Sequence, residues 1–159
     1  MPDPAAHPST SVKHSLPWIS GILTGVLSGI ILGFFLKVIQ ANTGEQVYTL
    51  LLNIDFVPVL PPTLPEWIEF SLHLVVSVLI GIFYVWCIRR TGHPMFKGVL
   101  LGAASSLLYI PLSQLSSRVP DLYDVSAILY WIVGHLLFGI VLGLCGKYIM
   151  NAKKATPAS

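Results

Sequence analysis

Charged residues are scarce in this sequence. Its 159 residues include nine Lys and Arg and seven Asp and Glu, so charged residues make up 10% of the chain and hydrophobic residues 54%. Soluble domains carry about a quarter charged residues, whereas disordered chains combine high charge with low hydrophobicity. The composition excludes both classes, and a net charge of +2 gives no support for a nucleic-acid-binding surface. The chain is therefore predicted to be an integral membrane protein, with the lipid bilayer as its first partner.

Cysteines and catalytic motifs are also scarce. Cys87 and Cys145 are too few for a disulfide framework, and neither lies in a C-x-x-C pair. We interpret them as small apolar packing residues. The sequence has no P-loop, no H-E-x-x-H and no G-x-S-x-G motif. These absences argue against an enzyme, including one that acts on lipid, and no metal or other cofactor is expected.

Four long apolar runs are predicted to cross the bilayer. Each has about 20 residues or more, enough for a hydrocarbon core of ~30 Å at ~1.5 Å per residue, and in lipid such runs must be helical. They cover residues 16–41, 67–88, 96–115 and 125–150. We therefore expect an all-α fold with a transmembrane domain over 16–150. Residues 1–15 read as a disordered tail and residues 151–159 as a second polar tail.

The loop between the first two runs, residues 42–66, contains a further apolar piece at 47–60. This piece is too short to cross a bilayer and carries Asn53, Asp55 and Pro58. We expect an interfacial or re-entrant segment there. The run Leu60-Pro-Pro-Thr-Leu-Pro65 follows it and stiffens the approach to the second span, because proline fixes φ and restricts the residue before it.

The basic residues are unevenly divided between the two sides of such a four-span chain. One side carries seven of the nine: Lys13, Arg89, Arg90, Lys97, Lys147, Lys153 and Lys154. The other side carries only Lys37 and Arg118. The positive-inside rule then predicts that both termini are cytoplasmic. No clear internal repeat relates the two halves.

Small residues recur at four-residue spacing in every predicted span, so that each span has one face where backbones can approach closely. The members are Gly21, Gly25, Gly29 and Gly33 in the first span, Ser77 and Gly81 in the second, Gly98 and Gly102 in the third, and Gly139 and Gly143 in the fourth. These faces predict close packing within a four-helix bundle. The alternative is that they form an oligomer interface or a seam that permits permeation.

Five polar residues lie where burial in lipid is costly. They are Lys37, His73, Tyr109, Ser113 and His135. Each lies near the small-residue face of its span, so packing of these faces should bring the five together on the outer side of the bundle. The two histidines are either neutral hydrogen-bonding residues or titrating groups, since histidine changes charge between about pH 5 and 8. Lys37 fits a snorkelling lysine better than a relay.

Pro111 lies inside the third predicted span. Proline removes one backbone hydrogen bond and kinks a helix. Ser106, Tyr109 and Ser113 are close enough in sequence to help satisfy the freed carbonyl. We expect a structural kink, with a hinge as the alternative.

The order and spacing of several short motifs resemble the YagU-like family of small bacterial inner-membrane proteins of unknown molecular function. The motifs are Gly21-Ile-Leu-Thr-Gly25-Val-Leu-Ser28, Leu60-Pro61-Pro62, Gly81 to Tyr84, Gly98-Val-Leu-Leu-Gly102-Ala103, Ile110-Pro111-Leu112 and Gly134-His135-Leu136. The resemblance is best over residues 71–146. Thr63 replaces an arginine common in the family loop, and Lys37 lies further from the glycine run than the family lysine does. The resemblance implies a location in the bacterial cytoplasmic membrane and supplies no reaction.

These features lead to two functional hypotheses. The first is a structural or accessory membrane protein that responds to pH or envelope stress through His73 and His135. The second is a small oligomeric channel or transporter for protons or another small ion. A homo-oligomer would favour the second, because four helices alone leave little room for a pore.

Overall fold

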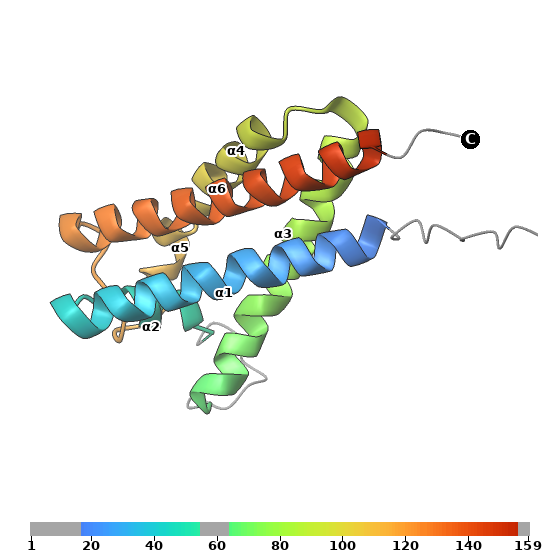
Figure 1. The fold of residues 1–159 in the computed structure, drawn as a ribbon. Coiled ribbons are helices and arrows are strands. Elements are labelled where there is room, and N and C mark those ends of the chain that lie inside the picture. The colour runs from blue at the N-terminus through green and yellow to red at the C-terminus, as the bar shows by residue number, and fades with distance from the viewer. Residues whose placement is uncertain (1–16, 55–63, 156–159) are drawn as a thin grey trace, which may run out of the picture.

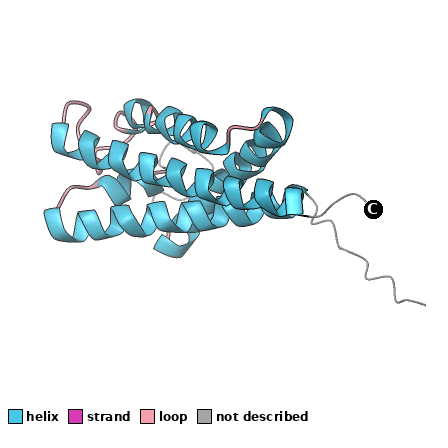
Figure 2. Ribbon diagram, turned by 45° about the horizontal axis from the view of Figure 1, so that its top comes forward, coloured by secondary structure: helices cyan, strands magenta, loops and turns pink. Residues whose placement is uncertain are grey.

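The structure is a computed structural model that describes residues 17–54 and 64–155. Its helices are α1 (Pro17–Thr43), α2 (Val47–Leu52), α3 (Glu66–Thr91), α4 (Pro94–Ser106), α5 (Tyr109–Leu112) and α6 (Val125–Ala155). No strand occurs in these two ranges (Figure 2). The predicted tail at 1–15, Asp55 and the Leu60–Thr63 motif lie outside the described residues.

Four stretches of helix are long and apolar enough to span a membrane, which confirms the predicted all-α transmembrane fold. They are Trp18–Thr43, Glu66–Thr91, Pro94–Leu112 and Val125–Ala152. The last helix continues to Ala155, beyond the predicted end of its span at residue 150. Its extra turns belong to the segment that the sequence assigns to a polar tail.

The four spans form two helix pairs. In the first pair α3 crosses α1, and in the second α4 packs along α6 (Figure 1). The pairs are joined mainly where α1 and α6 lie side by side. These two helices run in opposite directions, so the start of α1 and the end of α6 lie at the same end of the bundle (Figure 1).

The third span is broken into two helices rather than kinked at one residue. Between α4 and α5, the Leu107 and Leu108 amides bond to carbonyls three residues back, at 3.2 and 3.1 Å. The Ile110 amide likewise bonds to the Leu107 carbonyl at 3.2 Å. Proline at 111 has no amide hydrogen and disfavours a carbonyl four residues earlier, so this tighter turn replaces the α-helical bonds just before it. The Ser106 carbonyl is then left at the end of α4.

The short helix α2 packs inside the bundle, where Val47 and Leu50 are fully buried. Its first turn is held by Gln40 of α1. The Gln40 side-chain oxygen accepts hydrogen bonds from the amides of Tyr48 and Thr49 at 3.0 and 2.9 Å. Amides in the first turn of a helix have no partner within the helix, so Gln40 supplies the cap that α2 lacks in its own sequence.

A short repeat links α1 and α6, although sequence analysis found none. Gly29-Ile-Ile-Leu-Gly-Phe-Phe-Leu-Lys-Val-Ile39 and Gly139-Ile-Val-Leu-Gly-Leu-Cys-Gly-Lys-Tyr-Ile149 share both glycines, the lysine and three aliphatic positions. The two segments are buried in the same pattern, with both glycines inside and both lysines exposed. Because the helices are antiparallel, the same packing face is used in opposite directions.

Candidate functional site

The crossing of α1 and α3 is made by backbone contact. A Cβ atom added at Gly25 would lie 2.7 Å from the Val78 Cα atom, and one at Gly81 would lie 2.6 Å from the Gly25 Cα atom. Real Cβ atoms do not approach other atoms this closely, so the crossing requires glycine at both positions. Towards the far end of α1 the neighbour changes: a Cβ at Gly33 would meet the Phe70 ring instead of backbone.

The crossing of α4 and α6 is equally close. A Cβ atom at Gly98 would lie 2.6 Å from the Gly143 nitrogen, and one at Gly102 would lie 2.9 Å from the Gly139 Cα atom. A Cβ at Gly139 would in turn meet the Val99 Cα atom at 3.0 Å. In each helix pair, the predicted small-residue stripe therefore faces the partner helix of the same chain.

A cavity of about 240 Å³ lies where the two helix pairs meet. Its walls are mostly apolar and come from all six helices and from the turns that follow α2 and α4. The polar side chains that line it are Asn53, Glu69, His73, Ser77, Ser105 and His135. An apolar cavity with a few convergent polar groups is the usual form of a small-molecule site, and this one is large enough for several water molecules.

His73 of α3 links the first helix pair at this cavity. Its Nε2 atom lies 3.2 Å from the Gly29 carbonyl oxygen of α1. A carbonyl only accepts, so Nε2 carries the hydrogen in this bond. The Ser77 hydroxyl lies 3.5 Å from the same nitrogen, and the Phe70 ring lies at a centroid distance of 5.9 Å. His73 thus joins α3 to α1 next to the glycine crossing.

His135 of α6 is the most deeply placed histidine of the described chain and is only 3% exposed. Its Nδ1 atom donates to the Trp131 carbonyl of the same helix at 2.9 Å, which leaves Nε2 of the neutral ring as an acceptor. The His135 ring lies against the Trp131 indole with centroids 4.3 Å apart. The His135 carbonyl contacts the Gly102 position of α4. His135 therefore lies between the cavity and the second crossing.

Trp131 holds the break in the third span, a role that the sequence did not reveal. Its indole Nε1 donates to the Ser106 carbonyl at 2.9 Å, where α4 ends. Sequence analysis assigned the freed carbonyl to nearby hydroxyls. In the structure Trp131 is 1% exposed, and the Ser106 hydroxyl bonds to Ala103 instead. Trp131 follows Pro111 by 20 residues and lies in no sequence motif, so no pattern signalled this contact.

The structure brings two of the five predicted polar residues to this cavity, His73 and His135. Lys37 lies instead on the outer part of α1, where it pairs with Glu66. The Tyr109 hydroxyl donates to the Asp121 carbonyl at 2.8 Å, and its ring packs edge-on against Trp131. The Ser113 hydroxyl bonds to the Ile110 carbonyl of its own segment. Tyr109 therefore supports the cavity wall from behind.

Asn53 and Glu69 line the cavity and were not among the predicted site residues. Asn53 follows α2 and is 5% exposed, and Glu69 lies in the first turn of α3. The two side chains meet at the cavity because α2 packs against α3, and no periodicity in the sequence predicts that packing. Among the residues that the structure describes, no group of three or more His, Cys, Asp or Glu is arranged to hold a metal ion.

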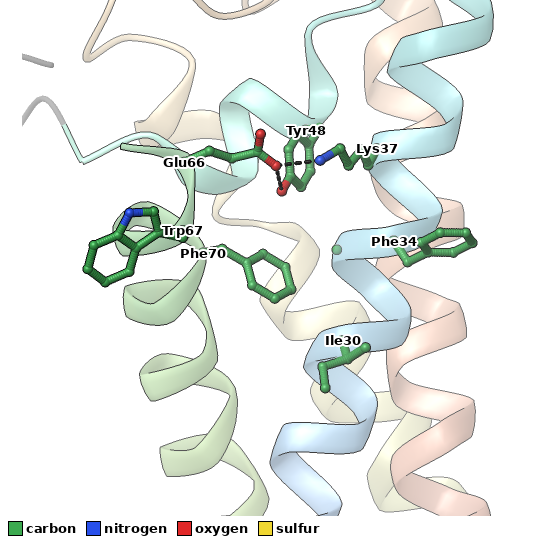
Figure 3. A pocket seen from close by; sticks show the side chains of 8 residues that line it. Ile30, Phe34, Lys37, Tyr48, Glu66, Trp67 and Phe70 are labelled. Carbon is green, nitrogen blue, oxygen red and sulfur yellow. Dashed lines mark hydrogen bonds and ion pairs between the residues drawn. The ribbon is translucent and has the colours of Figure 1, made fainter. Parts of the chain in front are cut away.

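A second, more open site lies between α1 and the start of α3 (Figure 3). Lys37 Nζ and Glu66 Oε1 are 2.5 Å apart, and the Tyr48 hydroxyl donates to the same oxygen at 2.9 Å. The Lys37 ammonium lies 5.3 Å from the centre of the Tyr48 ring. Burial raises the pKa of the Tyr48 phenol, and the Glu66 carboxylate raises it further, so the phenol stays protonated as a donor.

At the N-terminal end of α6, Asp124 caps the helix. Its Oδ1 atom accepts hydrogen bonds from the Ala127 amide at 3.1 Å and the Ser126 hydroxyl at 2.8 Å. These bonds hold the pKa of the Asp124 carboxyl below its ordinary value. The corresponding start of α3 follows Pro65 and has no side-chain cap.

Comparisons of the chain with family models, with curated proteins and with solved structures found no match.

Proposed function

We propose that this chain is an accessory protein of the membrane that responds to protons through the cavity between its two helix pairs. One observation carries the proposal: His73 and His135 belong to different pairs and line the same cavity. Among the described residues that line the cavity, no catalytic group set accompanies them, and we propose a non-enzymatic role without a cofactor.

The chemistry follows from burying imidazoles in a membrane helix bundle. A charged group in such a place costs several kcal/mol unless it is solvated or paired, so both rings are neutral at neutral pH. At acid pH one ring gains a proton, and the two histidines disfavour a second charge in the same cavity. Glu69 lines the cavity and offsets one positive charge, while Asn53, Ser77 and Ser105 can help to solvate it.

The expected response is a change in packing between the pairs. Water that enters to solvate an imidazolium must separate cavity walls from both pairs, since the lining includes Leu32 of α1 and Phe138 of α6. Within each pair the helices also meet through backbone contacts at glycine, and backbone atoms do not titrate. The junction is therefore the part that proton uptake would loosen.

We place the protein in the bacterial cytoplasmic membrane with both termini cytoplasmic. The support is the excess of Lys and Arg on one side and the resemblance to the YagU-like family, whose membership we also propose. A reporter fused after Ser159 should behave as cytoplasmic and one inserted near Gly44 as external. The reverse pattern would overturn this orientation.

Trp131 provides a built-in probe of the proposed response, because a protonated imidazole stacked on an indole quenches its fluorescence. Trp18 and Trp67 are highly exposed on the described surface and Trp86 is half exposed, so all three can be replaced by phenylalanine with little loss of packing. Trp131 fluorescence of this full-length variant in liposomes should then fall as the pH is lowered from about 6.5 to about 3.5, because a buried ring resists the charge.

The matched variants are His135→Gln and His73→Gln, which keep hydrogen-bonding side chains without a titrating ring. We expect His135→Gln to abolish the fluorescence change and His73→Gln to move its midpoint, because the second histidine no longer competes for the proton. A fluorescence signal that stays flat in the parent protein over this pH range would refute the proposal.

A second candidate function is passage of protons or another small ion by an oligomer. The distribution of cavity polar groups favours it, since they extend from Glu69 in the first turn of α3 to His135 deep in α6. Proteoliposomes with a pH-sensitive dye inside test it. Flux that His135→Ala abolishes would support the channel, whereas no flux from folded, inserted protein at any pH would leave the accessory function alone.

A further inference from the structure

The open site between α1 and α3 has the form of a groove with a polar end. It measures about 520 Å³ and lies on the outer half of both helices. Its walls come from Ile30 and Gly33 of α1 and from Phe70 of α3, which points towards α1 below the ion pair (Figure 3). Lys37, Glu66 and Tyr48 close the groove at the outer end (Figure 3).

The groove exists because α3 crosses α1 rather than lying along it. The two backbones touch at Gly25 and Gly81, and α3 then leads away from α1 towards its own first turn (Figure 1). Phe70 fills the gap only as far as Gly33. A wedge therefore stays open between two spans, on a surface that faces lipid.

The polar end lies at the level of lipid headgroups. Glu66 is the first residue of its span, and the adjacent Trp67 side chain is 70% exposed. Tryptophan is typical of the membrane–water interface. A molecule that occupies the groove thus has an apolar part beside Ile30 and Phe70 and a polar part beside Lys37 and Glu66.

The ion pair determines which headgroup fits. Lys37 and Glu66 side chains are 54% and 56% exposed, so both can bind a ligand without leaving a buried partner unpaired. Glu66 Oε1 accepts from Lys37 and Tyr48, while Oε2 accepts no hydrogen bond within the described parts of the chain. The site therefore offers ammonium hydrogens for a phosphate and one carboxylate oxygen for a donor cation.

We propose that this groove binds one phospholipid whose headgroup carries both a phosphate and a primary ammonium, as in phosphatidylethanolamine. The phosphate binds Lys37, the ammonium donates to Glu66, and an acyl chain lies in the groove beside Ile30. A phosphoglycerol headgroup has no cation to balance Glu66. A phosphocholine headgroup has a cation but no N–H to donate.

The test counts lipids that stay bound to the full-length protein. The protein is equilibrated in mixed micelles with equal amounts of phosphatidylethanolamine, phosphatidylglycerol and phosphatidylcholine of the same acyl chains, washed in detergent, and examined by native mass spectrometry. We expect one retained phosphatidylethanolamine per chain, at about fivefold excess over each of the other two lipids, as charge-assisted bonds on both headgroup ions would give.

Two variants separate the groove from the headgroup site. Ile30→Trp fills the groove and should lose the retained lipid, whereas Leu27→Trp adds the same bulk to an exposed position of α1 outside the groove and should retain it. Glu66→Gln removes the carboxylate and should remove the preference over phosphatidylcholine, a result that does not depend on whether Ile30→Trp folds. Equal retention of the three lipids, or equal retention by Ile30→Trp and Leu27→Trp, would overturn the proposal.

Discussion

The two helix pairs have the same kind of crossing but different bonds beside it. In both, glycines let backbones touch, and one ring N–H donates to a carbonyl of the partner helix. In the first pair the donor is His73, with Gly29 of α1 as acceptor. In the second the donor is Trp131, with Ser106 of α4 as acceptor. Only the first of these two donors titrates.

This difference shows where sensitivity to pH can enter the bundle. The indole of Trp131 holds its hydrogen at every physiological pH, so the second pair keeps its bond. The histidine bond of the first pair survives protonation, but it then places a charge in the cavity. The ring bond within the second pair is therefore independent of pH, whereas the ring bond within the first pair has a donor that can gain a proton.

Overpacking a glycine should give the largest effect and should break both pairs alike. Gly81→Leu in the first pair and Gly139→Leu in the second force a side chain against backbone, which costs about 3 kcal/mol or more. We expect loss of most folded protein in size-exclusion chromatography and thermal unfolding. The exposed neighbours Leu79→Ala and Ile140→Ala serve as controls. Stability equal to these controls would refute the glycine crossings.

Removing the ring donors should distinguish the two pairs by the pH dependence of their stability. Trp131→Phe leaves the Ser106 carbonyl without its indole donor and should cost about 2 kcal/mol at every pH. His73→Phe should cost less, about 1 kcal/mol at pH 8. Gly29 lies inside α1, so its carbonyl keeps a backbone hydrogen bond when the histidine is removed. Denaturation in detergent at pH 8 and pH 5 measures both.

The sign of the pH effect follows from burial. An unfolded histidine gains a proton below about pH 6.5, whereas the buried neutral ring resists it, so stability should decline as the pH falls below that value. The decline should be smaller in His73→Phe than in Trp131→Phe. The same decline in both variants would remove the proposed difference between the pairs.

Asp124→Ala tests a smaller difference, since α6 has a side-chain cap and α3 has none. Loss of the bonds to Ala127 and Ser126 should cost about 1 kcal/mol at pH 7. The pKa of this carboxyl is lowered by folding, so its contribution is present above the ordinary pKa and is lost as the pH falls through the lowered one. Thermal unfolding at pH 7 and in strong acid should show a gap that closes in acid.

Lys37→Gln should have the smallest effect on stability, about 0.5 kcal/mol, because the Lys37–Glu66 ion pair between α1 and α3 is half exposed. The matched change in the repeat, Lys147→Gln of α6, serves as the control. Thermal unfolding at low and high salt should show that only the Lys37 difference shrinks with salt. A large loss from Lys37→Gln would mean that the pair holds α3 to α1.

The sequence predicted the four spans and the glycine faces because both depend on local pattern. Hydropathy over about 20 residues identifies a span, and four-residue spacing places small residues on one face. It also marked His73 and His135 as unusual. What it could not supply is which faces meet, and so it could not show that the cavity is lined by the two histidines and not by Lys37 or Ser113. Lys37 lies away from the cavity, in the gap that opens where α3 diverges from α1 beyond their crossing.

The residues that sequence analysis missed depend on long-range contacts. Asn53 lines the cavity beside Glu69 of α3 because α2 is held to α1 by Gln40 and to α3 by the bond from Tyr48 to Glu66. The role of Trp131 is set by Pro111, which shortens α4 and leaves the Ser106 carbonyl for the indole to bind. Neither relation has a fixed spacing that a pattern could detect.

The segment shared by α1 and α6 carries a consequence for how the chain enters the membrane. The same packing face, with its two glycines and its lysine, is read in one direction in α1 and in the other in α6. Such a core packs equally well in either orientation across the bilayer. The orientation of the chain in the membrane must then depend on charged residues outside the core, above all on Arg89, Arg90 and Lys97. Transferring those basic residues to the loops on the opposite side would invert the orientation of the molecule while the packing of its core stays the same.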